Sequence, residues 1–189
     1  DQFLGTMFPK DIEFDRSLIN VTTIDIEVQS DQGFPHPHDA LYPITAITIK
    51  NNQDDIYYCW GVQEYDPKKS IVPNVHIKYF KCHNERDLLD RFITHWSHNY
   101  PDIVTGWNSR LFDMSYICNR VLRILGDKMM KKLSPWGIVN ENSIVIGGNS
   151  HPVFDVYGIQ QLDYLDLFKK FGYTYGTQES YRLDNIAHV

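Results

Sequence analysis

The chain has 189 residues and a net charge of −6 at pH 7, with 42% hydrophobic and 22% charged side chains. This composition is typical of one folded domain and excludes a disordered chain. No apolar run approaches the roughly 20 residues of a membrane helix and no apolar leader opens the chain, so we expect neither a membrane partner nor secretion. The acidic balance excludes nucleic-acid binding by bulk positive charge, although it allows clustered carboxylates that hold cations. The three scattered cysteines indicate a reducing compartment.

The first part of the chain is predicted to form strands. Alternating apolar and polar residues favour a strand over residues 19–28, with two carboxylates on its polar face. Residues 44–50 and 56–62 read as two strands joined by a short polar turn, and a fourth strand is expected at 75–80.

Helices begin after these strands. Asn84 has the residue type of a helix N-cap, and an apolar stripe follows it at helical spacing. The stripe consists of Leu88, Leu89, Phe92, Ile93 and Trp96. A short buried strand at 102–108 then turns at Gly106 into a second helix. Its expected inner residues are Ile117, Val121, Leu122, Ile124 and Leu125.

The last third of the chain has a looser pattern. Glycines at 147–148 predict the tip of a hairpin, and residues 158–165 read as a further strand. Asp166 is expected to cap a short basic helix, and a final helix is expected from Ser180. Strands that precede and then alternate with helices predict an α/β fold.

Two sets of residues carry candidate chemistry. Asp25 and Glu27 lie two apart on one strand, so they share a face and can grip one divalent ion or bridge two. A solvated acidic pair is the alternative interpretation. Asp113 falls in the first turn of the second helix, where an acidic residue also suits the helix dipole. Asn108, just before it, is either a functional residue or a plain helix N-cap.

Together these residues resemble a known family. The run D-I-E at 25–27, followed by N-x-x-x-F-D at 108–113, resembles the first two motifs of the 3′→5′ exonuclease domain of family B DNA polymerases. Further segments are similar to replicative polymerases of T-even-type tailed phages. They are G-F-P-H-P (33–37), N-E-R-D-L-L (84–89), T-G-W-N (105–108), L-S-P (133–135) and L-D-Y-L-D-L-F-K-K-F (162–171).

The resemblance implies a fold and a domain plan. The expected fold is α/β, a ribonuclease-H-like mixed sheet of about five strands flanked by helices, as in DEDD exonucleases. Residues 1–18 are expected to be an N-terminal lead-in, and residues 19–189 an exonuclease domain that stops before its third motif. The stretch 138–156 corresponds to a hairpin that helps to part primer from template in the family.

The same resemblance implies an active site. Asp25, Glu27 and Asp113 correspond to catalytic ligands of two Mg²⁺ or Mn²⁺ ions. Asn108 and Phe112 correspond to a polar contact with substrate and a packing residue, and Phe34 to an aromatic residue that stacks on the terminal base. A buried loop anchor is the alternative interpretation for Phe34.

Function and setting follow from the resemblance as well. The expected activity is proofreading, that is, hydrolysis of the 3′-terminal phosphodiester of DNA with release of nucleoside monophosphates. The expected partners are the single-stranded 3′ end of a DNA primer and the polymerase domains of a parent chain. The expected location is the cytoplasm of a phage-infected host cell.

The family's third motif, Y-x-x-x-D, is the main departure. The run from Tyr181 to Asp184 is one residue too short for it, so we interpret Asp184 as a solvated helix residue. We therefore expect the 189 residues alone to be weakly active or inactive. The alternatives are a catalytically silent DNA-binding and editing scaffold, a stand-alone DEDD nuclease on RNA or DNA, and, least favoured, a protein-interaction module.

Other polar clusters predict less. His36 and His38 have the spacing of a metal clip, but no further ligand stands at zinc spacing. His95 and His98 are interpreted as a solvent-facing helical pair. The basic cluster of Lys128, Lys131 and Lys132 is interpreted as a solvated face, with contact to DNA backbone as the alternative.

Overall fold

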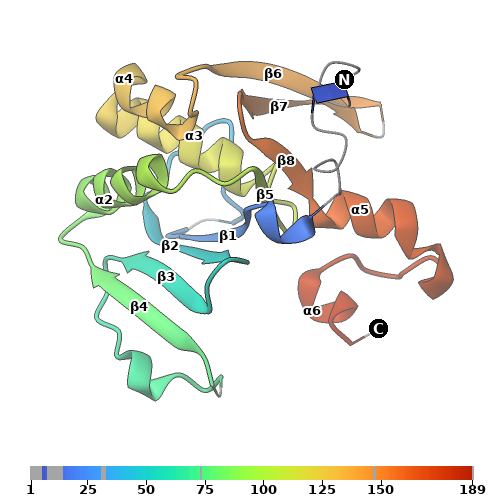
Figure 1. Ribbon diagram of the computed structural model, residues 1–189, viewed down its shortest axis with the longest axis horizontal. Helices are drawn as coiled ribbons and strands as arrows, with labels where there is room; N and C mark the ends of the chain where they lie inside the picture. Colours follow the sequence, from blue (N-terminus) through green and yellow to red (C-terminus); the bar gives the residue numbers. More distant parts are fainter. Residues whose placement is uncertain (1–5, 8–14, 31–32, 73, 147, 189) are drawn as a thin grey trace.

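The computed structural model describes residues 6–7, 15–30, 33–72, 74–146 and 148–188. Within them lies a mixed six-stranded sheet with the order β4-β3-β2-β1-β5-β8, beside a two-stranded ribbon, β6-β7 (Figure 1). The strands are β1 (Val21–Val28), β2 (Ile44–Asn51), β3 (Ile56–Gly61), β4 (His76–Lys81), β5 (Ile103–Gly106), β6 (Val139–Ile146), β7 (Asn149–Val156) and β8 (Gln160–Asp163). The helices are α2 (Glu85–His98), α3 (Asp113–Leu125), α4 (Asp127–Met130), α5 (Tyr164–Phe171) and α6 (Leu183–Ile186).

The sheet confirms the predicted α/β class and has six strands rather than about five. β2 is antiparallel to both of its neighbours, β1 and β3, while β4 is parallel to β3, and β5 and β8 continue parallel to β1. Parallel neighbours bring the carboxyl ends of β1, β5 and β8 to one edge of the sheet. β1 itself carries Asp25 and Glu27, and the loops that leave this edge carry Phe34 and Asn108 and lead to Asp113 at the start of α3.

Helices α2 and α3 cover one face of the sheet (Figure 1). The predicted stripe on α2 is fully buried, and the Asn84 side chain accepts a hydrogen bond from the Asp87 backbone N–H at 3.1 Å, which confirms the N-cap. On α3, Ile117 and Val121 are buried as expected. Leu122 is 41% exposed, so its assignment to the inner side was wrong. It follows Val121 by about 100° around the helix axis, away from the core stripe.

A buried ion pair fixes the segment between β1 and β2. Arg120 on α3 donates from Nε to Glu85 Oε1 at 2.7 Å, and the same oxygen accepts from the Ile44 backbone N–H at 2.8 Å. Arg120 also donates to the Ala40 carbonyl at 2.9 Å. Because the Ile44 N–H and the Ala40 carbonyl are both hydrogen-bonded to this ion pair, the loop that leads into β2 is held against α3.

The boundary between β8 and α5 differs from the prediction. The strand stops at Asp163 and the helix starts at Tyr164, because the Asp163 side chain accepts from the Leu165 backbone N–H at 2.9 Å. Asp163 is therefore the N-cap, and Asp166 lies inside the first turn. The final helix, α6, begins at Leu183 rather than near Ser180.

The ribbon of β6 and β7 confirms the predicted hairpin. The strands pair antiparallel with Ile146 opposite Asn149 at the tip. Gly148 has a φ of +85°, a conformation that suits glycine in a tight turn, while Gly147 lies outside the described residues.

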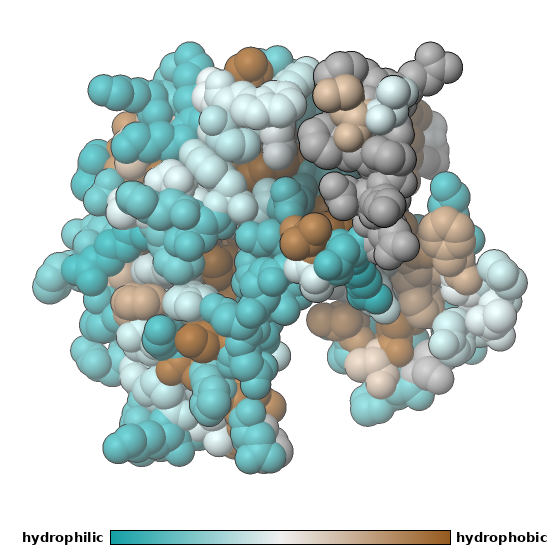
Figure 2. Space-filling model, viewed as in Figure 1, coloured by the Kyte–Doolittle hydropathy of each residue, from teal (hydrophilic) through white to brown (hydrophobic). Residues whose placement is uncertain are grey.

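The surface is predominantly hydrophilic on the face drawn in Figure 2, where apolar side chains form small scattered areas. Among the helices of the described segments, none is both long enough and apolar enough to cross a membrane.

Candidate active site

Asp25 and Glu27 project from the face of β1 opposite its core residues. Ile24 and Ile26 alternate with them and are buried, so the period of two sends both carboxylates to the open face. Partial burial raises the pKa of Asp25 above its usual value. Burial and the neighbouring charge of Asp25 raise the pKa of Glu27. The predicted pair is therefore confirmed as two side chains on one face.

Asp113 joins this pair from α3. It is the first residue of the helix, only 4% exposed, and its Oδ1 accepts a hydrogen bond from the Ile26 backbone N–H at 3.0 Å. That contact places the carboxyl against β1, near enough to Asp25 for the two charges to interact. Burial, followed by the negative charge of Asp25, raises the pKa of Asp113 to about 8.

The turn before α3 depends on a close approach of two strands. A Cβ added to Gly106 would lie 2.6 Å from the Ile24 carbonyl oxygen, so only glycine lets the end of β5 pass this near to β1. The approach brings Asp113 to β1 a few residues later along the chain.

The donor chemistry fits a hard divalent cation. Oxygen-only ligands suit Mg²⁺ or Mn²⁺, and no Lys, Arg or His of the described segments pairs with Asp25, Glu27 or Asp113. The geometry is not that of a closed centre, because no three His, Cys, Asp or Glu side chains of the described residues converge as a metal-binding group. The structure thus brings the carboxylates into one neighbourhood without closing a site around an ion.

Asp163 is a buried carboxylate of this edge that the sequence reasoning did not single out. It is 6% exposed, and its two oxygens accept from the backbone N–H groups of Asn108, Arg110 and Leu165 at 3.0, 3.0 and 2.9 Å. Burial raises its pKa despite these donors. Asp163 therefore ties the turn after β5 to the start of α5. The available signal was an Asp at the end of a strand pattern, directly before a helical one.

Replacing Asp163 with Ala is expected to lower the free energy of unfolding by about 2–3 kcal/mol, because three partly buried backbone donors lose their acceptor and α5 loses its cap. Urea unfolding followed by circular dichroism measures the change. The matched control is Asp166→Ala, an exposed acidic residue in the same first turn, which should change stability by less than about 0.5 kcal/mol. Equal effects of the two substitutions would contradict the role given to Asp163.

Asn108 is not the N-cap of α3. That position belongs to Phe112, which makes no side-chain capping bond, so the plain N-cap interpretation of Asn108 was wrong. Asn108 has a φ of +63° and lies in the turn that Asp163 holds. Its side chain lines a cavity of about 260 Å³ together with Phe112 and Phe34.

Phe34 is 72% exposed, so the alternative of a buried loop anchor was wrong. Its ring centroid lies 5.1 Å from that of Phe112, which in turn lies 5.5 Å from the ring of Tyr116. The rings of Phe34, Phe112 and Tyr116 form a row that we call the aromatic ladder. Its outer ring, Phe34, is open to solvent on one side and packs on Phe112 on the other. An exposed aromatic ring on a rigid base can stack on a nucleobase.

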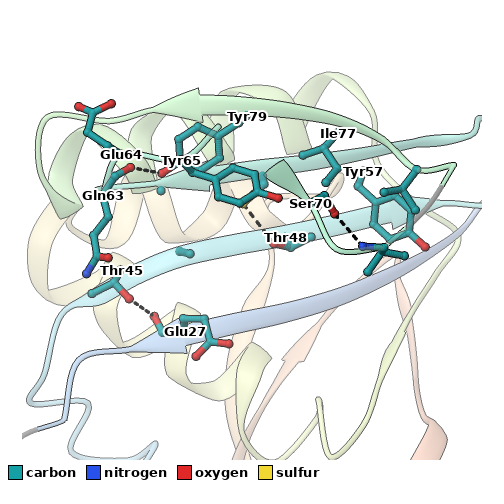
Figure 3. A pocket seen from close by; sticks show the side chains of 15 residues that line it. Glu27, Thr45, Thr48, Tyr57, Gln63, Glu64, Tyr65, Ser70, Ile77 and Tyr79 are labelled. Atoms are coloured by element: carbon teal, nitrogen blue, oxygen red, sulfur yellow. Dashed lines mark hydrogen bonds between the residues drawn. The ribbon is translucent and has the colours of Figure 1, made fainter. Parts of the chain in front are cut away.

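A larger cavity, of about 570 Å³, adjoins Glu27 on the open face of the sheet (Figure 3). Glu27 lies at its edge, where the Thr45 hydroxyl donates to the Glu27 carbonyl at 3.1 Å. Tyrosine rings of β3 and β4, Tyr57 and Tyr79, form part of its wall.

The remaining polar clusters are structural or exposed. The prediction that His95 faces solvent was wrong. The centroid of its ring lies 4.8 Å from that of Tyr58 and 5.1 Å from that of Trp60, and burial lowers its pKa. Asp184 is exposed, as expected. Lys131 pairs with Asp127 at 2.7 Å on the surface.

The six-stranded mixed sheet with helices, and carboxylates at the end of β1 and the start of α3, define a ribonuclease-H-like exonuclease fold. The family described as DNA polymerase family B, exonuclease domain, matches residues 7–186. The chain belongs to this family.

Relatives from viruses agree with this assignment. The chain is 34% identical to the DNA-directed DNA polymerase of Escherichia phage RB69 and 35% identical to that of Enterobacteria phage T4, in each case over 98% of the chain. It is 24% identical to the putative DNA polymerase 060R of Frog virus 3 over 90% of the chain. The aligned region makes up 22%, 22% and 18% of these relatives, so the chain spans about a fifth of their length.

Proposed function

We propose that the chain is a proofreading 3′→5′ exonuclease domain that hydrolyses the terminal phosphodiester of DNA and releases nucleoside monophosphates. The observation that carries the proposal is the buried carboxyl of Asp113, which lies against β1 and interacts with the charge of Asp25, while Glu27 shares the strand face of Asp25. The substrate would be the single-stranded 3′ end of a primer. In a longer polymerase chain, the neighbouring polymerase domains would deliver it.

Asp25, Glu27 and Asp113 are the residues that would hold Mg²⁺ or Mn²⁺, two ions in the complete site. Such ions activate a water molecule for attack and stabilise the charge on the leaving oxygen. The chain's own contributions are positional. Asp113 would give up its proton on binding a cation, because a ligating carboxylate must be ionised. The turn that Asp163 holds aims the Asn108 side chain toward the cavity beside Phe34.

A 5′-labelled single-stranded oligonucleotide tests the proposal directly, with protein in excess and Mn²⁺ present. We expect slow shortening by single nucleotides when the 3′ end is a free hydroxyl, and none when an inverted nucleotide blocks it. Internal cuts, or equal cleavage of the blocked strand, would show a different nuclease activity.

A second candidate function is a DNA-binding and editing scaffold without catalysis. It is favoured by one observation, the lack of a closed three-ligand metal group among the described side chains. Binding of the free 3′ end with no shortening at any Mn²⁺ concentration would support this candidate over the first.

Phe34→Ala is expected to weaken binding of single-stranded DNA by about tenfold, since stacking contributes about 1–3 kcal/mol per base. Fluorescence anisotropy with a labelled oligonucleotide measures the affinity. Because Phe34 is exposed, the free energy of unfolding should change by less than about 0.5 kcal/mol. The matched control is Phe171→Ala, an exposed phenylalanine on α5, which should leave the affinity unchanged.

A further inference from the structure

Three histidines surround the cavity of about 260 Å³ next to the aromatic ladder. His36 and His38 come from the loop after β1, and His151 comes from β7 of the hairpin. Phe34 and Phe112 line the same cavity. Histidines from two segments that are far apart in the sequence thus line one cavity beside the stacking ring.

The loop that carries two of these histidines is held in place. Asn119 on α3 donates from its side chain to the Pro37 carbonyl at 2.9 Å, between the two histidines. Arg123 donates to the Ala40 carbonyl at 2.7 Å, a little further along the loop. The backbone is therefore fixed to α3, and the imidazoles are presented from a rigid base rather than from a loose loop.

The charged groups around the cavity determine which ligand these imidazoles can bind. The lining of this cavity, within the described part of the chain, includes no lysine or arginine. Two carboxylates lie nearby: Glu141 on β6, with Oε1 4.0 Å from His38 Nδ1, and Asp39 in the loop. Arg123 is the nearby cation, and it also donates to the Asp39 carbonyl at 2.6 Å. The carboxylates at the end of β1 add further negative charge. Within this lining, the histidines are the side chains that can present a positive charge to DNA, and they do so in the protonated form.

We propose that His36, His38 and His151 bind, as imidazolium ions, the phosphates next to the nucleotide that stacks on Phe34. This inference rests on the proposed function, because it assigns the phosphate contacts of the same DNA end. A phosphate favours the protonated form of an imidazole beside it, so the bound complex takes up protons. Affinity is then highest at acidic pH and is lost as the pH rises through the range in which histidine titrates.

The test is the affinity of the 189-residue chain for a 5′-fluorescent oligothymidylate, measured by anisotropy from pH 6 to pH 8.5 at constant ionic strength, without divalent ions. A contact that raises the pKa of one imidazole by one unit makes binding about tenfold tighter well below that pKa. We expect the Kd to rise at least about tenfold from pH 6 to pH 8.5. In the triple variant His36→Gln, His38→Gln, His151→Gln, the Kd should stay near the wild-type value at pH 8.5 throughout.

Two controls make the outcome specific. His76→Gln changes an exposed histidine on β4, at the far edge of the sheet, and should keep the wild-type pH dependence. A thermal melt checks that the triple variant is folded, and the three single variants replace it if it is not. A pH-independent Kd in the wild type, or an unchanged pH dependence in the folded histidine variants, would overturn this assignment and leave the proposed nuclease function standing. A chain that binds no oligonucleotide at any pH would overturn both.

Discussion

Replacing Asp113 with Asn is expected to make the protein more stable at pH 8 by about 3–5 kcal/mol. The pKa of Asp113 is raised from 3.8 to about 8 in the folded state, chiefly by burial. Between these values the unfolded chain releases this proton while the folded chain keeps it. Stability therefore falls as the pH rises from about 4 to about 8, by up to about 1.4 kcal/mol per pH unit, and levels off above pH 8. Asn has no such proton and keeps an oxygen for the Ile26 N–H.

Urea unfolding between pH 5 and pH 9 measures this difference. The stability of the wild type should decline across the range relative to that of Asp113→Asn, and the two should approach each other at pH 5. The matched control is Asp166→Asn, which changes an exposed acidic residue in the first turn of α5. Its free energy of unfolding should vary with pH in parallel with that of the wild type. Parallel profiles for wild type and Asp113→Asn would contradict the buried, proton-holding state of Asp113.

A destabilising carboxyl of this kind suggests a function outside folding. Proteins commonly keep such residues at functional sites, where activity opposes stability. If Asp113 is a cation ligand, Mn²⁺ should raise the stability of the wild type at pH 8 and should have little effect on Asp113→Asn, since a ligand stabilises only the state that binds it.

Asp25→Ala is expected to reduce Mn²⁺-dependent shortening of DNA by about 10²-fold or more, to background. The residue would supply a ligand where charge develops in the reaction, and the loss of one such group typically costs at least this factor. The fold should remain intact, because Asp25 faces outward from β1. Removing its charge also relieves repulsion on Asp113, so the pKa of Asp113 should fall.

A single-turnover assay with a 5′-labelled strand measures the rate. Thr23→Ala is the matched control, because Thr23 is an exposed residue two positions away on the same face of β1. It should leave the rate within about twofold of the wild type. Shortening that survives in Asp25→Ala would place the chemistry elsewhere in the molecule.

Local pattern predicted the central elements well. In β1 the alternation of Ile24 and Ile26 with carboxylates depends only on the strand period, and the structure has the same faces. The N-cap at Asn84 and the stripe behind it likewise need nothing beyond helical spacing. The family resemblance supplied Asp113, and the structure adds its contact with the β1 backbone.

Tertiary contacts decided what the sequence did not reveal. The strand pattern at 158–165 ends at Asp163, whose side chain caps α5. The same side chain also accepts bonds from a turn about 55 residues earlier in the chain, and these long-range bonds leave no trace in the local pattern. His95 is half-buried because it meets the aromatic rings of β3, not because of its own helix spacing. The exposed ring of Phe34 packs on the ring of Phe112, a residue from a distant part of the sequence, so this contact could not be predicted from local pattern.

The central claim is that Asp25, Glu27 and Asp113 form one divalent-cation site. Calorimetric titration with Mn²⁺ at pH 8 tests it most directly, on the wild type and on Asp25→Asn and Asp113→Asn, with Thr23→Ala as control. We expect weak binding by the wild type and the control, with release of protons, and a loss of at least about tenfold in affinity in each Asn variant. An affinity that is the same in all four proteins would contradict it.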